Sequence, residues 1–285
     1  MIREKWLSAH RRYHNEGAKS VLLLYPRRLR AWIRTFSKFW GRTVELKGNI
    51  VEIEGLEFSV AVPGLPAVEK ARFLFDRYER PERITIREFL DPKVPVVEFG
   101  ANIGVVSCIV NKKLQSPEQH IVVEANPTLI PLLKQNRERN QCHFEITACA
   151  VAYGVDQVSF NLDEHILGSS LLVGTRKSAI VPATTLARIL DEHDLPLCTL
   201  ICDIEGSEVE LISNEAGVIR DRVSAFFVEV HPKIRGQQAI DEAVQTLIDL
   251  GFEKKFDRWS NMVFVNSALS ANSRGHKAKT AGLTR

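Results

Sequence analysis

The sequence predicts a doubly wound α/β fold, in which helices cover both faces of a mostly parallel sheet. The first observation is the stretch Val94–Gly104, where an apolar run ends at Glu98 and two glycines follow. A buried parallel strand is almost continuously apolar, and a glycine allows the tight turn from that strand into a helix. The second observation is that further apolar runs end in or before acidic residues: Ile121–Val123, Leu197–Asp203 and Ala225–Val230. In such folds ligands bind at the carboxyl ends of the strands.

The first strand and turn have the form of a nucleotide-binding corner. Gly100 permits a turn whose backbone approaches a ligand, and a helix from near Ile103 would aim free N–H groups at that ligand. Glu124 follows 24 positions after Gly100, close to the spacing at which an acid holds ribose hydroxyls. The alternative is that Glu124 only ends its strand and caps a helix that starts at Pro127. The glycine turn after the first strand and Glu124 after the second strand together predict an adenosine-binding site.

Three motifs carry a family resemblance: Glu98-Phe-Gly-Ala-Asn-Ile-Gly, Glu124-Ala-Asn-Pro and Asp203-Ile-Glu-Gly-Ser-Glu. From about Tyr78 to Val265 the chain resembles the FkbM family of S-adenosylmethionine-dependent methyltransferases. The resemblance implies the class I methyltransferase fold, a seven-stranded sheet closed by an antiparallel hairpin, with S-adenosylmethionine as cofactor. The family usually has Asp where this chain has Glu98, whose carboxylate lies one methylene further from the backbone. The resemblance implies that the cofactor is bound by Glu98, Gly100, Ala101, Asn102, Gly104, Glu124, Ala125 and Asp203.

A group of polar side chains is expected at two neighbouring strand ends. Asp203 and Glu205 alternate at the end of one strand, and Glu229 and His231 alternate at the end of the next. We assign catalysis to Asp203, Glu229 and His231, with His231 as a general base because its ordinary pKa lies near 6.5. No residue is assigned as a metal ligand. Two alternatives stay open: a divalent metal bound by Asp203, Glu229 and His231, or a structural role in capping helices and pairing with arginines.

The charge of the chain is unevenly distributed. Residues 1–42 hold eleven Lys and Arg against two acids, a balance of +9, which leaves −6 for the remainder of a chain whose net charge is +3. In this basic N-terminal extension Leu29, Trp32, Ile33, Phe36 and Trp40 share one helix face. That face either lies on an anionic membrane surface or packs on the protein body, and we favour packing. Nucleic acid is not expected as a partner, because no zinc-finger spacing or aromatic sheet motif accompanies the basic residues.

Other segments complete the predicted organisation. Residues 43–80 are expected to form a hairpin that turns at Gly48-Asn49, followed by a helix over Ala67–Tyr78. Tyr78-Glu79 and the loop from Gly168 resemble family segments that border an acceptor pocket. The alternatives are that Tyr78 is an aromatic residue packed at a helix end, and that the loop from Gly168 is only a turn. Phe144–Ala152 is expected as one strand, and Thr184–His193 as a helix capped by threonine. The methyltransferase domain is expected over 81–266, and 267–285 as a disordered tail.

The remaining composition argues for a cytoplasmic protein, with peripheral membrane association if the basic helix binds lipid. The five cysteines form no C-x-x-C pair and lie mostly in apolar segments, as expected of reduced core thiols. No apolar run approaches the roughly 18 residues of a membrane span, and no signal peptide is expected.

We therefore expect a methyltransferase that acts on a hydroxyl of a sugar, glycolipid or other natural product, so that its partner is a small-molecule or a glycan- or lipid-linked acceptor. One alternative is a nicotinamide-dependent oxidoreductase, since the ribose acid and glycine turn serve that cofactor too. The other is a catalytically silent adenosine-binding scaffold protein. No oligomeric state follows from the sequence.

Overall fold

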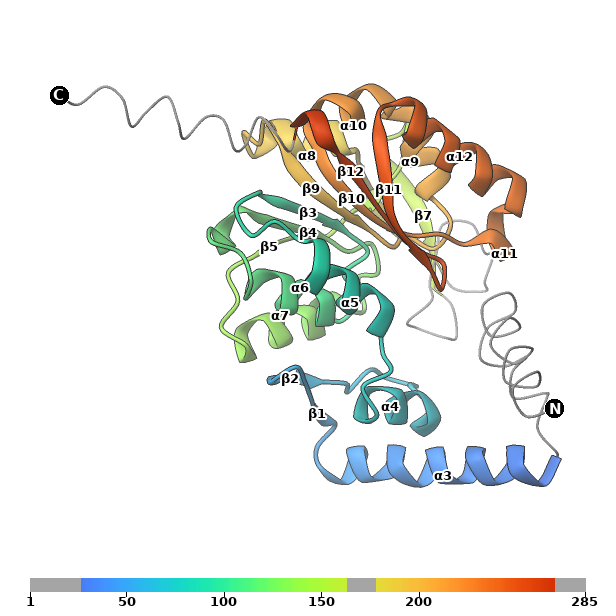
Figure 1. Cartoon of the computed structure of the whole chain (residues 1–285). Helices are drawn as coiled ribbons and strands as arrows, with labels where there is room; N and C mark the ends of the chain where they lie inside the picture. The colour runs from blue at the N-terminus through green and yellow to red at the C-terminus, as the bar shows by residue number, and fades with distance from the viewer. Residues whose placement is uncertain (1–26, 163–177, 270–285) are drawn as a thin grey trace.

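A computed structural model describes residues 27–162 and 178–269, and Figure 1 shows their arrangement. The main sheet has seven strands in the order β11-β12-β10-β9-β3-β4-β5. All neighbouring pairs from β10 to β5 are parallel, and β12 runs antiparallel to both β10 and β11. The predicted doubly wound fold with a closing antiparallel hairpin is confirmed. The strands are β3 (Val96–Phe99), β4 (His120–Val123), β5 (Glu145–Thr147), β9 (Cys198–Cys202), β10 (Val223–Glu229), β11 (Phe252–Arg258) and β12 (Asn261–Asn266).

Helices cover both faces of this sheet because its central strands are buried on both sides. Along β3, Val96 packs into one apolar cluster and Val97 into the other, as alternation along a strand requires. The first face is covered by α5 (Arg80–Phe89), α6 (Val105–Asn111) and α7 (Ile130–Arg139). The opposite face is covered by α8 (Leu186–Glu192), α9 (Glu208–Asn214), α10 (Ala216–Arg222) and α12 (Gln237–Asp249), with the short α11 (Pro232–Arg235) before α12. All five cysteines are buried and free, as predicted.

The segment predicted as one strand over Phe144–Ala152 forms two short strands in different sheets. β5 joins the main sheet, whereas β6 (Ala150–Val151) pairs with β8 (Ser178–Thr184). β8 also pairs with β7 (Gln157–Asn161), which makes a second sheet of three strands. The prediction was wrong because the backbone turns between Thr147 and Cys149, where the Cys149 N–H donates to the Thr147 carbonyl. The threonine cap was correct, since the Thr185 side chain accepts from the Arg188 N–H at the start of α8.

An N-terminal unit of α3 (Arg27–Leu46), α4 (Ala67–Leu74) and a hairpin lies at the bottom of Figure 1. The hairpin consists of β1 (Ile50–Ile53) and β2 (Leu56–Ser59), and it turns at Glu54-Gly55 rather than at Gly48-Asn49. All four of those turn residues have positive φ, so both pairs were acceptable turns by sequence. The prediction was wrong because α3 runs past the expected boundary at residue 42 to Leu46, and Gly48-Asn49 ends that helix.

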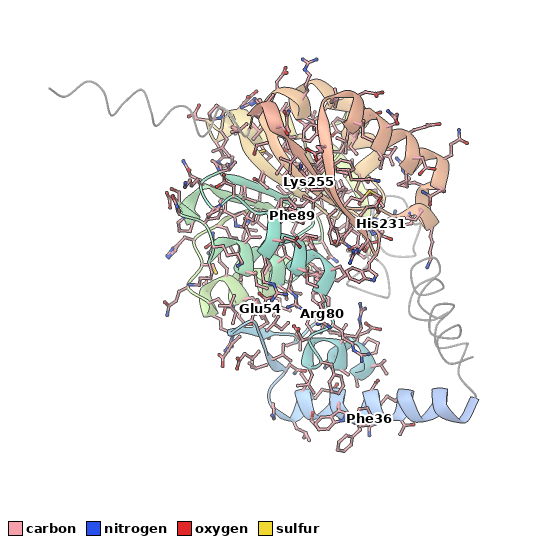
Figure 2. The ribbon with its side chains drawn as sticks, in the orientation of Figure 1. Phe36, Glu54, Arg80, Phe89, His231 and Lys255 are labelled. Carbon is pink, nitrogen blue, oxygen red and sulfur yellow. The ribbon has the colours of Figure 1, made fainter. Side chains whose placement is uncertain are left out.

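Two asparagines and one arginine fasten the hairpin to the main body. Asn136 on α7 is fully buried; its Oδ1 accepts from the Ser59 N–H at 2.7 Å, and its Nδ2 donates to the Ser59 carbonyl at 3.1 Å. Asn140 contacts the backbone N–H and carbonyl of Glu57 in the same way, at 3.0 and 2.8 Å. The buried Arg83 on α5 pairs with Glu54 of the hairpin turn, which Figure 2 labels. The Asn136 and Asn140 side chains form hydrogen bonds with the β2 backbone of the kind that a neighbouring strand would form.

The predicted apolar face of α3 packs in part and is exposed in part. Trp40 contacts Phe75, and a Cβ at Gly41 would lie 1.7 Å from the Ala67 carbonyl oxygen, so α3 and α4 touch through their backbones. Phe36 also stacks on Phe75, with ring centroids 6.1 Å apart, yet it is 41% exposed, and Figure 2 shows it on this outer helix. Phe39, which was not part of the predicted face, is 60% exposed. The side chains of Leu29, Trp32 and Ile33, the loop from Gly168 and residues 270–285 of the predicted tail lie outside the described residues. No helix in the described ranges is both long and apolar enough to cross a membrane.

Replacing Asn136 with Ala is expected to lower the free energy of unfolding by about 1–3 kcal/mol, because the Ser59 N–H and carbonyl stay buried without partners. Urea denaturation of the two proteins measures the difference. Lys134→Ala on the exposed side of α7 is the matched control and should be close to neutral. Equal stability of Asn136→Ala and wild type would show that α7 does not hold the hairpin.

Candidate functional site

An open cleft lies where β3, β4 and β9 end, and residues that follow these three strands line it. This is the position at which doubly wound folds bind ligands. Apolar residues of the second sheet, such as Val151 and Phe160, form part of the wall. The residues of the predicted cofactor set that line it are Gly100, Asn102, Glu124, Ala125 and Asp203.

Glu124 is fixed by backbone hydrogen bonds at the end of β4. Its Oε2 accepts from the Asn102 N–H at 2.6 Å, and its Oε1 accepts from the Asn126 N–H at 2.7 Å. Burial raises the pKa of Glu124 to about 7, although these backbone donors and that of Ala125 lower it. Each carboxylate oxygen has a further lone pair, so the side chain can accept from two hydroxyl groups in the cleft. Glu124 orders the turn that follows β4 and lines the cleft, whereas the expected helix at Pro127 begins only at Ile130 and is not capped by Glu124.

The two glycines of the first motif have separate structural reasons. Gly100 has φ +92°, and a Cβ there would lie 1.7 Å from the Asp203 carbonyl oxygen. Gly104, with φ +85°, precedes α6, and its Cβ would lie 2.6 Å from Cδ1 of Leu133 on α7. Ala101 is buried, and its N–H faces the Val123 carbonyl. Neither Ala101 nor Gly104 is among the described residues that line the cleft, so these two position the turn rather than its ligand surface.

Glu98 lies within a buried network and is also absent from the described cleft lining. Its Oε1 accepts from the Ser107 hydroxyl at 2.6 Å, and its Oε2 lies 3.0 Å from Nε2 of His120 on β4. Glu98 and His120 are 2% and 0% exposed. The extra methylene of Glu relative to Asp carries the carboxylate outward from β3 to both partners. In this chain Glu98 links β3, β4 and α6.

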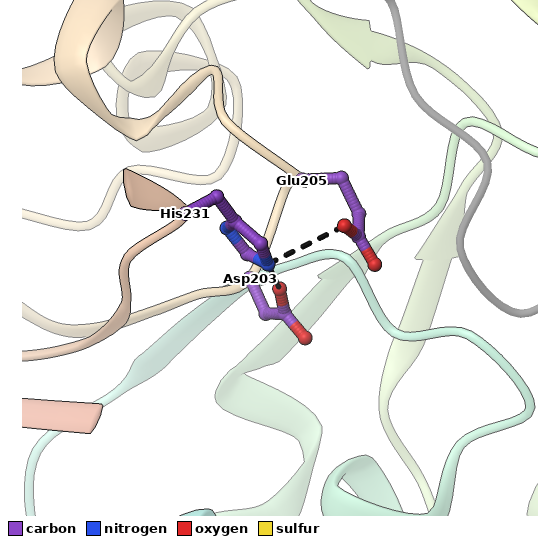
Figure 3. Close-up of side chains that lie close together, drawn as sticks. All are labelled: Asp203, Glu205 and His231. Atoms are coloured by element: carbon purple, nitrogen blue, oxygen red, sulfur yellow. Dashed lines mark ion pairs between the residues drawn. The ribbon is translucent and has the colours of Figure 1, made fainter. Parts of the chain in front are cut away.

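His231 lies close to three carboxylates from the segment that follows β9, two of which, Asp203 and Glu205, are drawn in Figure 3. Its Nε2 lies 3.5 Å from Oδ1 of Asp203 and 3.3 Å from Oε2 of Glu205, while its Nδ1 lies 3.1 Å from Oε1 of Glu208. Asp203 and Glu205 face the same side, as alternation predicted, although Glu205 sits in a turn with φ +51°. The same Oε1 of Glu208 accepts the Ile204 N–H at 2.9 Å and the Gly206 N–H at 3.2 Å, which fixes this turn.

The pKa values of the ionisable groups in this cluster lie far from their ordinary values. Burial lowers the pKa of His231, but the hydrogen bond to Glu208 and the charges of Asp203, Glu208 and Glu205 outweigh it and raise the pKa to about 10. Burial and the charge of Glu229 raise the pKa of Asp203 well above its usual range. Perturbed groups of this kind gather at functional sites.

Glu229 approaches the cluster from the end of β10. Burial raises its pKa, while His231 and a hydrogen bond with Asn261 lower it.

Tyr78 stacks on Phe73 with ring centroids 3.9 Å apart, as expected if it is a packed aromatic residue. The neighbouring Glu79 has a pKa raised to about 8 by burial and by the charges of Glu98 and Glu229. The acidic region therefore extends from β9 to the start of α5.

Three polar residues of this site were not assigned from the sequence. Glu208 is the last residue of the third motif but was given no role there, and its approach to His231 depends on the tight turn before it. Ser207 lines the cleft with a buried hydroxyl that makes no hydrogen bond within the described part of the chain. Glu82 is 8% exposed, and its pKa is raised by burial and by Glu79, Asp203 and Glu229. A carboxylate in the buried stripe of an amphipathic helix was the available signal for Glu82.

The comparison with known families agrees with the motifs. Residues 98–254, more than half of the chain, match the model of the methyltransferase FkbM domain. Among curated proteins, the chain has no match.

Several solved structures are similar to the chain at low identity. A methyltransferase from Pyrococcus furiosus is 12% identical with a TM-score of 0.41, covering 83% of this chain and 98% of its own. Precorrin-6y C5,15-methyltransferase from Geobacter metallireducens is 13% identical with a TM-score of 0.38, covering 65% and 86%. Aeropyrum pernix fibrillarin, solved with natively bound S-adenosyl-L-methionine, is 12% identical with a TM-score of 0.36, covering 62% and 69%.

The raised pKa of Glu124 predicts a pH-dependent stability. Between its ordinary value of about 4.5 and about 7, the folded state binds more protons than the unfolded state, so the free energy of unfolding falls as pH rises. Relative to Glu124→Gln, which has no proton to lose, the ligand-free wild type should lose about 3 kcal/mol across this window. Urea denaturation at several pH values measures the difference. If the free energies of unfolding of the two proteins changed with pH in the same way, the raised pKa of Glu124 would be contradicted.

Proposed function

Because the chain belongs to the FkbM methyltransferase family, we propose that it transfers a methyl group from S-adenosylmethionine to a hydroxyl of a sugar, glycolipid or other natural product. The observation that carries the proposal is the composition of the cleft. Glu124, fixed for hydroxyl binding, and the Asp203–Glu205 turn line the same cavity. One cleft thus offers both a nucleoside-binding acid and acidic groups for an acceptor.

The residues present fit the cofactor. Glu124 would hold the two ribose hydroxyls, since its two oxygens each retain an acceptor position beyond the backbone N–H. The buried Ser207 hydroxyl and Oδ1 of Asp203, which make no hydrogen bonds within the described ranges, would bind polar groups of the methionine part. When bound, S-adenosylmethionine supplies an electrophilic methyl group.

The acidic turn has the groups that an acceptor hydroxyl needs. An oxygen nucleophile has to be oriented, and its proton has to pass to a group within hydrogen-bond reach. Asp203 and Glu205 present carboxylate oxygens at the cleft margin. His231 keeps its proton at neutral pH because its pKa is raised to about 10, so it orients these carboxylates as a cation instead of acting as the general base expected from its ordinary pKa. Glu229 acts on Asp203 through its charge. A polyhydroxylated acceptor suits the site because carboxylates accept hydrogen bonds from hydroxyl groups.

Calorimetry with the purified chain tests the cofactor assignment. S-adenosylmethionine and S-adenosylhomocysteine should bind, and Glu124→Ala should weaken both by about 5–150-fold, which corresponds to about 1–3 kcal/mol for a charged hydrogen-bonding group. Glu118→Ala, which removes an exposed carboxylate, is the control and should bind like wild type. Tight NAD binding without S-adenosylmethionine binding would favour the oxidoreductase alternative.

The acceptor class is tested with labelled S-adenosylmethionine and a panel of sugars, glycolipids and phenolic alcohols. A methyl ether product supports the proposal, and methylation of nitrogen or carbon alone contradicts it. Donor binding without transfer to any acceptor class would favour the silent scaffold protein.

We also propose that the exposed part of α3 binds an anionic membrane surface, which would bring the enzyme to lipid-linked acceptors. Phe36 and Phe39 are exposed apolar rings, and the same helix contains Lys38 and Arg42. Aromatic side chains at the acyl boundary with cations over lipid phosphates are the arrangement of interfacial helices.

Sedimentation with phosphatidylglycerol vesicles tests this surface. The wild type should bind at low salt and release at high salt, and the double variant Phe36→Ser, Phe39→Ser should bind less. Ile180→Ser, which removes an exposed apolar side chain on β8, is the control and should behave like wild type. Equal binding by all three proteins, or none by the wild type, would contradict the proposal.

A further inference from the structure

Three potential metal-ligand atoms meet at the cleft margin. The ligand atoms of Asp203, Glu205 and His231 all lie within 4.8 Å of one another. Figure 3 shows Asp203 and Glu205 directed toward the same edge of the His231 ring. The three residues come from the turn after β9 and the end of β10, which pair as parallel neighbours. Sheet topology, rather than a single flexible loop, brings them together.

The two distances from Nε2 of His231 are close to those between ligands of one ion. Ligands about 2.1 Å from a common divalent ion lie roughly 3.0–3.4 Å apart at octahedral or tetrahedral angles. In the structure Nε2 of His231 lies 3.3 Å from Oε2 of Glu205 and 3.5 Å from Oδ1 of Asp203. Small side-chain rotations suffice to place an ion between these atoms.

Glu208 gives the site the second layer that metal-binding histidines usually have. A histidine ligand typically donates its other ring nitrogen to a carboxylate, which fixes its tautomer and orientation. Here Nδ1 of His231 faces Oε1 of Glu208 at 3.1 Å, which leaves Nε2 for an ion. Glu208 has a side chain only 1% exposed, and its Oε1 is held by the turn backbone.

A second observation points to a missing cationic partner. The Oδ1 of Asp203 and the Oε2 of Glu208 are buried and make no hydrogen bond within the described ranges. Buried carboxylate oxygens are costly unless paired or bound to a metal. His231 pairs with both residues, and an ion bound at its Nε2 would replace the ring proton and place a larger positive charge beside these carboxylates.

We propose that Asp203, Glu205 and His231 bind a divalent cation, with Glu208 as the residue that positions His231. One imidazole with two carboxylates favours Mn²⁺ or Zn²⁺ over Mg²⁺ and Ca²⁺, which prefer oxygen ligands alone. Asp203 and Glu205 line the cleft, so the ion would border the position of the acceptor. A cation there would lower the pKa of an acceptor hydroxyl, and this role, unlike the binding, rests on the proposed function.

Calorimetry with the chelator-treated full chain tests the site, using Mn²⁺, Zn²⁺ and Mg²⁺ separately and without cofactor or acceptor. One equivalent of Mn²⁺ or Zn²⁺ should bind, and the melting temperature should rise because the ion binds only the folded state. Electron paramagnetic resonance of the Mn²⁺ form should show coupling to a histidine nitrogen. Absence of saturable binding by all three cations would overturn the proposal.

The metal affinities of single variants distinguish residues that bind the ion from residues that only lie near it. Glu205→Gln, at a partly exposed position, should lose most of the affinity, and Glu208→Gln should lose about 10–100-fold while keeping the same stoichiometry. Glu210→Gln removes an exposed carboxylate of the same helix and should bind like wild type. Circular dichroism confirms folding, and wild-type affinity of Glu205→Gln contradicts the site. Since these measurements need no methyl donor, their failure is distinct from a failure of S-adenosylmethionine binding.

Discussion

The cleft depends on the close approach of two backbone segments, the turn at Gly100 and the end of β9. The Asp203 N–H donates to the Phe99 carbonyl at 2.9 Å, and the Asp203 carbonyl occupies the volume that a side chain at position 100 would fill. This contact sets Asp203 beside the turn that Glu124 orders. Without it, Glu124 and Asp203 would belong to separate strand ends with no shared cavity. The glycine therefore serves the backbone contact first and the ligand surface second.

The acidic end of the cleft shows how a fold holds several carboxylates at one strand edge. Desolvation and mutual repulsion raise the pKa values of Asp203, Glu82 and Glu79, so part of this charge is neutralised by protons. Glu208 is stabilised differently, by the two backbone N–H groups that it accepts from its own turn. The one histidine of the cluster offsets part of the remaining charge. Such an arrangement costs stability, which is more typical of a functional site than of a structural one.

The sequence predicted what depends on strand burial and on local motifs. Apolar runs located the central strands, the position of each strand end located Glu124, Asp203 and His231, and alternation predicted that Asp203 and Glu205 share a side. The strand positions were predicted because a buried parallel strand constrains every residue along it. Asp203 and Glu205 lie beyond β9, and it is the turn at Glu205, with φ +51°, that places both carboxylates beside His231. The family motifs added the closing hairpin, which composition alone does not reveal.

Where the sequence failed, tertiary contacts decided the outcome. Either Gly48-Asn49 or Glu54-Gly55 can turn a hairpin, and the second is selected by Asn136, Asn140 and Arg83, which lie far along the chain. The contact of Glu98 with His120, which the sequence did not predict, arises because two distant strands pair in one register. Glu208 reaches His231 only because the intervening turn folds back. Periodicity carries no information about such pairs of polar residues.

The first end of the cleft, at Glu124, and the second end, at Asp203, differ in how far their polar groups are fixed before a ligand binds. Glu124 has both oxygens bound by backbone N–H groups, so its position is fixed by the main chain and needs no ligand. Asp203, Ser207 and Glu208 instead retain buried polar atoms without hydrogen bonds in the described ranges. A ligand at the first end therefore meets a carboxylate that needs little reorganisation, whereas the second end gains stability from whatever polar or cationic group reaches it.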